Sequence, residues 1–460
     1  MEQFIVINGC PKGKKSITLK FVEYLQKKNP QIEFQYFHVA QDIRKYSARP
    51  DAWKPLLEAL ENAQGVIWSF PVYVFHAPAS LMRFVEMISE MGLQEAFSGK
   101  YTASISTSIH FYDNFAHDQL RASLEDLGMR FTECFTADQA DFFKDQARSA
   151  LEYFFKDFLS AIQEQHPVYR KYYPLEQKPW TYVPKPPKAP VALNGKKVAI
   201  VADITPGSNI GPMVERFAAA FEGSVEVVDL SKLNIRGACL GCMKCAFDNE
   251  CTYDGKDDIK GIYNQILDPC DILIYAGALS GRYFSAQMKL FIERRFMRTH
   301  YPFMKDKQVA LLVAGPLSQA QTLYDTFDAD VQVSEAHFAG AVSDEVSSTA
   351  ALDEAIDVMA RRLVSMSEAT YIPPYSFLGI AGRKMFRDEV WGRYRFVFQA
   401  DHRYYKKRGF YDFPQKDWRT RVQNFWLMLR FSFPKTRRQV RNTMTGFMVK
   451  PFVDELNKIK

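Results

Sequence analysis

The sequence predicts an α/β protein built from two tandem doubly wound parallel-sheet domains and a mainly helical C-terminal extension. Three observations support this prediction. The 460-residue chain repeats a pattern of apolar strand, loop and helix, a proline-rich linker separates the repeats, and the composition changes near residue 370. Strands that alternate with helices form parallel sheets with both faces covered. We therefore expect domains at 1–165 and 196–370, a linker at 166–195 and an extension at 371–460.

The two halves repeat the same elements at matched spacings. Ile17, Phe21, Val22 and Leu25 form the apolar stripe of the first predicted helix. A later helix begins at Ala79 in the first half and at Ala286 in the second, and each lies 24 residues before a strand, which begins at Ala103 or at Ala310. This equal spacing indicates a duplication. The paired strands are predicted at 4–7, 66–68 and from 103 in the first half, and at 198–201, 272–275 and from 310 in the second.

The linker is marked by seven prolines between His166 and Lys196. Proline fixes φ and lacks a backbone N–H, so this segment should run extended instead of joining a helix or a central strand.

Four cysteines close together distinguish the second half: Cys239, Cys242, Cys245 and Cys251. Two residues between the first three and five before the fourth are typical of a loop that ligates an iron–sulfur cluster. A zinc ion or scattered structural cysteines are the alternatives, although zinc ligands usually come as two separated pairs. The second half is 13 residues longer between its first strand and its later helix (88 residues against 75), which an inserted cysteine loop explains.

In the first half, the loop after the first strand has the residues of a phosphate site. Glycine permits a tight turn, a helix N-terminus offers free N–H groups, and Ser16 and Thr18 add hydroxyls, with Lys12 among the lysines at the rim. The alternative is an ordinary loop in which Ser16 caps the helix.

The next two loops carry a family resemblance. Pro71, Val72 and Tyr73 follow a strand, a Pro-Ala pair precedes the helix, and Thr107 follows the strand from 103. This half resembles the flavodoxin-like NADPH-dependent FMN reductases. The resemblance implies that Lys12, Ser16 and Thr18 hold the FMN phosphate and that Pro71, Val72, Tyr73 and Thr107 lie near the ring. Cys10 stands where the group usually has serine, a change that a backbone contact would tolerate. Core packing is the alternative for Tyr73 and Phe75.

The second half resembles the iron–sulfur flavoproteins of the same superfamily, through its cysteine motif and the acidic pair Asp257 and Asp258. The resemblance implies a [4Fe-4S] cluster on the four cysteines. Its flavin loops are poorer, but Ser208 and Gly211 leave a second FMN site open.

Together these features predict an oxidoreductase that couples two-electron transfer at FMN to one-electron transfer at a cluster. NAD(P)H as donor follows from the resemblance alone, because no Gly-x-Gly-x-x-Gly fingerprint opens either half; a ferredoxin is the other donor. The sequence indicates no catalytic acid or base, since His76 and His110 are isolated loop histidines. A non-catalytic electron carrier or a zinc-stabilised scaffold is the alternative function.

Residues 371–460 carry 20 Lys+Arg against 7 Asp+Glu, a net charge of +13, and 20 aromatic residues. This composition suits packing over the two halves, an acidic redox partner or an anionic membrane surface, and an apolar helix is predicted at 422–431. No nucleic-acid motif is present. We further expect a small-molecule or redox-protein acceptor and a possible homo-oligomer. Without a signal peptide, we expect a cytoplasmic protein with Cys10, Cys134 and Cys270 reduced and buried.

Overall fold

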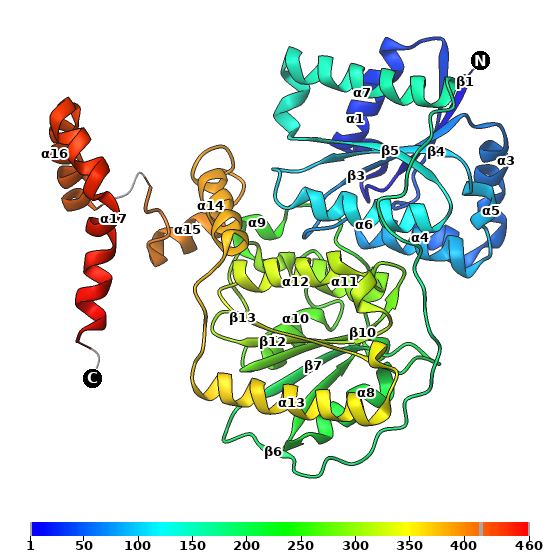
Figure 1. The fold of residues 1–460 in the computed structure, drawn as a ribbon. Helices are drawn as coiled ribbons and strands as arrows, with labels where there is room; N and C mark the ends of the chain where they lie inside the picture. The colour runs from blue at the N-terminus through cyan, green and yellow to red at the C-terminus, as the bar shows by residue number, and fades with distance from the viewer. Residues whose placement is uncertain (1, 414–416, 459–460) are drawn as a thin grey trace. The chain divides into compact units, whose positions relative to one another are not determined.

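The computed structural model describes residues 2–413 and 417–458. These form two compact units that meet between Tyr404 and Tyr405. The first unit contains both sheets, the linker and the first part of the extension, and the described residues of the second form helices and their connections (Figure 1). The compact-unit boundary therefore falls later in the chain than the predicted start of the extension at residue 371.

The first sheet is parallel throughout, with strand order β2-β1-β3-β4-β5. Its strands are β1 (Glu2–Asn8), β2 (Ile32–Phe37), β3 (Gly65–Pro71), β4 (Tyr101–Thr107) and β5 (Arg130–Ala137). Its helices are α1 (Ile17–Lys28), α2 (Ile43–Ala48), α3 (Lys54–Asn62), α4 (Ala79–Glu90), α5 (Gln94–Phe97), α6 (Asp113–Asp126) and α7 (Asp145–Gln163).

Helices cover both faces of this sheet, as the apolar strands require. One face packs against α1 and α7, and the other against α3, α4 and α6 (Figure 1). The predicted stripe of α1 is confirmed for Phe21, Val22 and Leu25, but Ile17 is 48% exposed and Leu19 takes its place in the core. Ile17 is the first residue of the helix, and the core contacts of α1 begin at Thr18 and Leu19.

The second sheet has the order β13-β12-β10-β7-β9, which matches the first strand for strand. Its strands are β7 (Val198–Asp203), β9 (Val225–Asp229), β10 (Ile272–Ser280), β12 (Gln308–Ala314) and β13 (His337–Ser343), with β11 (Tyr283–Phe284) paired antiparallel to β10. A separate pair joins β6 (Val191–Ala192) to β8 (Phe221–Glu222). Its helices are α8 (Ile210–Ala219), α9 (Cys245–Asp248), α10 (Ile259–Ile262), α11 (Ala286–Arg294), α12 (Gln321–Val333) and α13 (Thr349–Glu368).

The two sheets share one hydrophobic core, in which α4 and α6 of the first half face α11 and α12 of the second (Figure 1). The contact between α4 and α11 is reciprocal. The Ala79 N–H at the start of α4 donates to Glu293 of α11 (3.0 Å), and the Ala286 N–H at the start of α11 donates to Glu86 of α4 (2.6 Å). Each carboxylate therefore satisfies an N–H that the partner helix leaves unpaired.

The linker runs without a regular element from residue 165 to 190, as its prolines predict. The extension contains α14 (Phe377–Trp391), α15 (Gln399–Arg408), α16 (Trp418–Ser432) and α17 (Pro434–Leu456). Within the first unit, α14 packs on α12. None of the helices built by the described residues combines the length and the apolar character that a membrane span requires.

Candidate functional site

Three loops meet at the carboxyl edge of the first sheet, the edge formed by the C-terminal ends of its strands. The Val72 N–H donates to the Thr107 carbonyl (3.1 Å), which joins the loops after β3 and β4. The Thr18 and Thr107 hydroxyls share a hydrogen bond of 2.6 Å, which joins the loops after β1 and β4. Ligands of open α/β sheets bind at this edge, so the residues predicted for FMN are brought together where a cofactor would bind.

In the loop after β1, the structure shows the capping reading of Ser16. The Ser16 hydroxyl accepts from the Leu19 N–H and so caps α1. Ser16 and Thr18 are buried, whereas Lys12 is exposed. Of the three residues assigned to the phosphate, only Lys12 therefore presents its side chain to solvent, and the roles of the other two stay predictions.

The loop after β3 forms a tight turn from Tyr73 to His76. The Tyr73 N–H donates to the His76 carbonyl (2.7 Å), and Val74 and Phe75 have φ of 47° and 69°. This left-handed conformation is costly for residues with a Cβ, so the surrounding packing must hold it. Phe75 is buried, as its core alternative predicts, and Tyr73 is half-buried.

The expectation of an isolated, solvated histidine is wrong for His76. This side chain is fully buried, and its Nε2 lies 3.0 Å from the Thr326 hydroxyl of α12. Burial lowers the pKa of His76 well below its usual value, so the ring is neutral. Its role is to join the two halves through their shared core.

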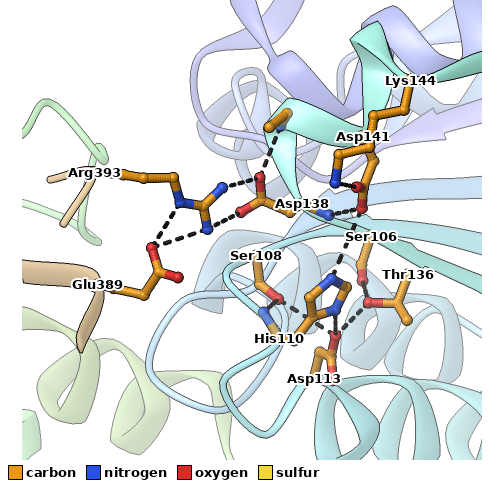
Figure 2. Close-up of polar contacts among 11 residues, drawn as sticks. Ser106, Ser108, His110, Asp113, Thr136, Asp138, Asp141, Lys144, Glu389 and Arg393 are labelled. Carbon is orange, nitrogen blue, oxygen red and sulfur yellow. Dashed lines mark hydrogen bonds and ion pairs between the residues drawn. The ribbon is translucent and has the colours of Figure 1, made fainter. Parts of the chain in front are cut away.

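The loop after β4 carries a hydrogen-bonded cluster around His110 (Figure 2). His110 Nδ1 lies 3.0 Å from Asp113, which also accepts from the Thr136 hydroxyl. The hydrogen bond to Asp113 raises the pKa of His110. Burial opposes ionisation of Asp113, but the hydrogen bonds from His110 and Thr136 outweigh it and lower the pKa of that carboxyl. His110 is therefore paired with Asp113 and is not isolated. The sequence alone did not indicate this pairing.

The first part of the extension binds next to this cluster. Arg393 forms a two-pronged contact with Asp138 (2.8 and 3.2 Å) and also donates to Glu389 (2.9 Å), as Figure 2 shows. The Tyr394 hydroxyl accepts from Gln139 (2.9 Å). Bidentate arginine–carboxylate pairs orient their partners strongly, so Arg393 and Tyr394 fix this part of the extension at the carboxyl edge of the first sheet.

The four cysteines of the second half line one small cavity, together with Arg294 at the end of α11. Cys245 is buried, Cys239 and Cys251 are half-buried and Cys242 is exposed. Burial, and then the Glu293 carboxylate, raise the pKa of the Cys239 thiol to about 12, and burial also raises that of Cys245. A bound metal centre would take the place of these thiol protons.

Charged residues connect the two ends of the cysteine loop. Arg294, which is 3% exposed, donates to Asp257 (2.7 Å), to the Gly237 carbonyl (2.9 Å) and to the Cys251 sulfur (3.8 Å). Asp258 accepts from the Asn234 N–H (2.7 Å). The acidic pair noted in the sequence therefore joins the two ends of the cysteine loop, and Arg294 brings a positive charge to its thiols.

The cysteine loop touches the predicted flavin loops directly. A Cβ on Gly241, which lies between Cys239 and Cys242, would stand 1.9 Å from the Tyr73 hydroxyl and 3.2 Å from a side-chain carbon of Lys12. Gly241 also has φ of +60°, which favours glycine. Burial raises the pKa of Tyr73 well above its usual value. Tyr73 therefore lies between the two candidate sites.

A buried ion pair on α11 links the same two loops. Lys289 donates to the Tyr73 carbonyl (2.7 Å) and contacts Glu293 (3.2 Å), and neither side chain is exposed. Glu293 in turn accepts from the Cys239 N–H (2.8 Å) and from Ala79. Neither Lys289 nor Glu293 stands out by its type in the sequence. The repeat marks Glu293, which occupies in α11 the place of Glu86 in α4.

The geometry of the cysteines, all of which the structure describes, shows neither of the two predicted metal centres. Among residues 2–413 and 417–458, no group of three or more His, Cys, Asp or Glu side chains could hold a metal ion. A single zinc draws its four ligands to about 2.1–2.3 Å from one point, whereas the thiolates of a four-iron cube bind separate corners and stand farther apart. The described cysteines share a cavity but form no group that could hold a metal ion, so the cluster and the zinc ion both stay predictions.

At the second sheet, the linker covers the loop that corresponds to the phosphate loop. Asn209 precedes α8; its side chain accepts from the Tyr182 N–H (2.9 Å) and donates to the Trp180 carbonyl (3.1 Å) and to Asp344 (2.8 Å). The linker backbone therefore forms hydrogen bonds with the Asn209 side chain at the start of α8. Gly211 lies within that helix, and the Ser208 hydroxyl donates to the Thr205 carbonyl (2.8 Å).

The three remaining cysteines were expected to be buried, and one of them is not. All seven cysteines are free, and Cys10 and Cys270 are buried as predicted. Cys134 is exposed, so the prediction of its burial is wrong. It lies on β5, the edge strand of the first sheet, where one side of the strand faces solvent.

Comparison with known proteins supports the family resemblance of the first half. Residues 3–140 match the family NADPH-dependent FMN reductase, and the match ends before the linker and the cysteine loop. No curated protein matches the chain.

Solved structures with flavin-related names also align with part of the chain. NADH:FMN oxidoreductase EMOB is 23% identical with a TM-score of 0.30, covering 34% of this chain and 88% of its own. FerB, an NAD(P)H:acceptor oxidoreductase from Paracoccus denitrificans, is 20% identical with a TM-score of 0.31, covering 36% and 98%. General stress protein 14 from Treponema denticola, in complex with FMN, is 15% identical with a TM-score of 0.27, covering 36% and 99%.

Proposed function

We propose that this chain is an NAD(P)H-dependent oxidoreductase that holds FMN on its first half and a [4Fe-4S] cluster on the cysteine loop of its second half. The family match over residues 3–140 supports the flavin part. The cavity shared by Cys239, Cys242, Cys245 and Cys251 supports the cluster part. In this proposal the two halves descend from a duplicated flavodoxin-like domain, which the matching strand orders support.

The contact between Tyr73 and Gly241 carries the proposal, because it joins the predicted flavin loop to the predicted cluster loop. FMN exchanges electrons in pairs or singly, and a [4Fe-4S] cluster passes them one at a time, so the two would connect hydride-type and one-electron partners. Lys12 would meet the phosphate, and Pro71, Val72, Tyr73 and Thr107 would shape the ring site. Lys289 and Glu293 hold the Tyr73 and Cys239 loops in register from one helix.

The acceptor in this proposal is a small molecule or a redox protein, and a ferredoxin could replace NAD(P)H as donor. Seven free cysteines suit a reducing compartment such as the cytoplasm. Self-association into a homo-oligomer would not be needed to bring the two sites together, because one chain supplies both.

Iron, acid-labile sulfide and flavin counted per chain in protein purified without oxygen would test this function. We expect one flavin and four irons per chain, flavin bands in the visible spectrum and a paramagnetic signal after one-electron reduction. Flavin without iron would remove the cluster and leave a simple FMN reductase. Zinc in place of iron and no flavin would support the scaffold.

A further inference from the structure

The second compact unit, residues 405–460, has an unusual surface. Trp418, Phe425 and Trp426 of α16 are 66%, 57% and 64% exposed, and no residue of this helix is buried. Large apolar side chains gathered on one helix without a core to cover them mark an interaction surface.

These side chains lie on one face of α16. Apart from the adjacent Phe425 and Trp426, the apolar residues of this helix recur at intervals of three or four residues, which keeps them within about a third of the helix circumference at 3.6 residues per turn. We call this set the apolar face of α16: Trp418, Val422, Phe425, Trp426 and Leu429, all exposed. On the same geometry, Arg419, Arg421 and Arg430 flank it on both sides.

The next helix repeats the pattern in its last turns. Met448, Val449, Phe452, Val453 and Leu456 of α17 are exposed and spaced for one face. Residues 405–460 contain 14 Lys+Arg against 4 Asp+Glu, a net charge of +10. An apolar face rich in tryptophan, with arginines at its borders and a large positive charge, is typical of a helix that lies in the interface of an anionic bilayer.

We propose that residues 405–460 bind the surface of a membrane that contains anionic lipids, with the apolar face of α16 inserted among the headgroups. Charge complementarity selects this occupant, since each basic residue near such a surface adds attraction. The helix lies on the bilayer and does not cross it, as none of the described helices could span one. This proposal does not depend on the cofactors of the first unit.

Vesicle flotation of the full-length protein tests it. With vesicles of phosphatidylcholine containing phosphatidylglycerol at low salt, we expect binding that falls by about tenfold or more in high salt or with phosphatidylcholine alone. The double variant Phe425→Ser/Trp426→Ser should lose about tenfold or more in partitioning. The control Gln423→Ser/Asn424→Ser changes two exposed polar residues of the same helix and should bind like the parent.

Quenching of tryptophan fluorescence by brominated lipid gives an independent reading. The parent should be quenched, and Trp418→Phe/Trp426→Phe should still bind while losing most of the quenching, because Phe keeps the apolar face. The proposal is overturned by no binding to anionic vesicles at low salt, or by equal binding of the Phe425→Ser/Trp426→Ser variant. It is also overturned if that variant instead converts a dimer of the parent to a monomer, which would make the face a contact between copies.

Discussion

The two sheets of the first unit have the same strand order but different carboxyl edges. At the first edge, Lys12 remains exposed and the three loops are joined through Thr107. At the second edge, the linker residues Trp180 and Tyr182 cover the start of α8. The second half also has 13 extra residues, which the cysteine loop explains. One framework can therefore support two different tasks, because its loops change while its strands and covering helices stay the same.

The strongest test of this division is the loss of a thiol. Cys242→Ser should reduce iron and sulfide to near zero while leaving flavin content unchanged, because an Fe–S cluster of this type needs all four thiolates. Metal analysis and the visible spectrum of anaerobically purified protein would measure it. Cys134→Ser is the control, as that thiol is free, exposed and on β5. Loss of flavin together with iron would show that the two sites are not separate.

Next in size is the buried ion pair. Glu293→Gln should lower the free energy of unfolding by about 3 kcal/mol, because it leaves Lys289 buried without its counter-charge. Glu86→Gln changes the matching residue of α4, which has no buried lysine partner and should cost about 1 kcal/mol. Urea denaturation would compare them. The double variant Glu293→Gln/Lys289→Met should be more stable than Glu293→Gln alone; if it is not, the charge is not the cause.

The contact between the loops can be broken at one glycine. Gly241→Ala should destabilise the protein by about 2–3 kcal/mol, because the new Cβ would meet the Tyr73 hydroxyl and alanine resists positive φ. Gly255→Ala is the matched control, since Gly255 has φ of +71° with no atom within 4 Å of a new Cβ. It should cost only about 1 kcal/mol. Equal losses would mean that the Tyr73 contact contributes nothing.

A smaller effect is expected at the first edge. Lys12→Gln should weaken FMN binding about fivefold, or about 1 kcal/mol, by removing one charge near the phosphate. Ser208→Ala, in the corresponding loop of the second half, should leave FMN affinity unchanged. Titration of apoprotein with FMN, followed by flavin fluorescence, would measure both. A larger loss for Ser208→Ala would place the flavin on the second sheet instead.

The smallest effect concerns pH. The raised pKa of His110 stabilises the fold below the usual histidine range and this stability is lost as pH rises through the folded pKa. The lowered pKa of Asp113 acts above the usual aspartate range, so the pair contributes most between about pH 4 and 6.5. His110→Gln should cost at most about 0.5 kcal/mol at pH 5.5, because the side chain is 44% exposed, and less at pH 8.5. Thermal unfolding at both pH values would check it.

Much of the first unit could be predicted from local sequence patterns. The strands from Phe4 and Val198 and the helices from Ala79 and Ala286 lie where the pattern placed them. The sequence also offered helix capping as the alternative to a phosphate contact for Ser16, and the structure shows this cap. Burial was harder to predict, and the errors at Ile17, Cys134 and His76 arose where an element begins, lies at a sheet edge or faces the other half.

The sequence by itself determined the α/β elements, the extended linker and the candidate residues for flavin and cluster, because hydrophobic period, proline and cysteine spacing act over a few residues. Only the tertiary structure decided that Tyr73 meets Gly241, that Lys289 and Glu293 join the two loops, and that the linker covers the start of α8. The contacts that cross between the halves, at Tyr73 and Ala79, depend on how α4 packs on α11, which brings together residues about 170–220 positions apart. Local periodicity cannot encode that packing, since many pairs of apolar helix faces are chemically alike.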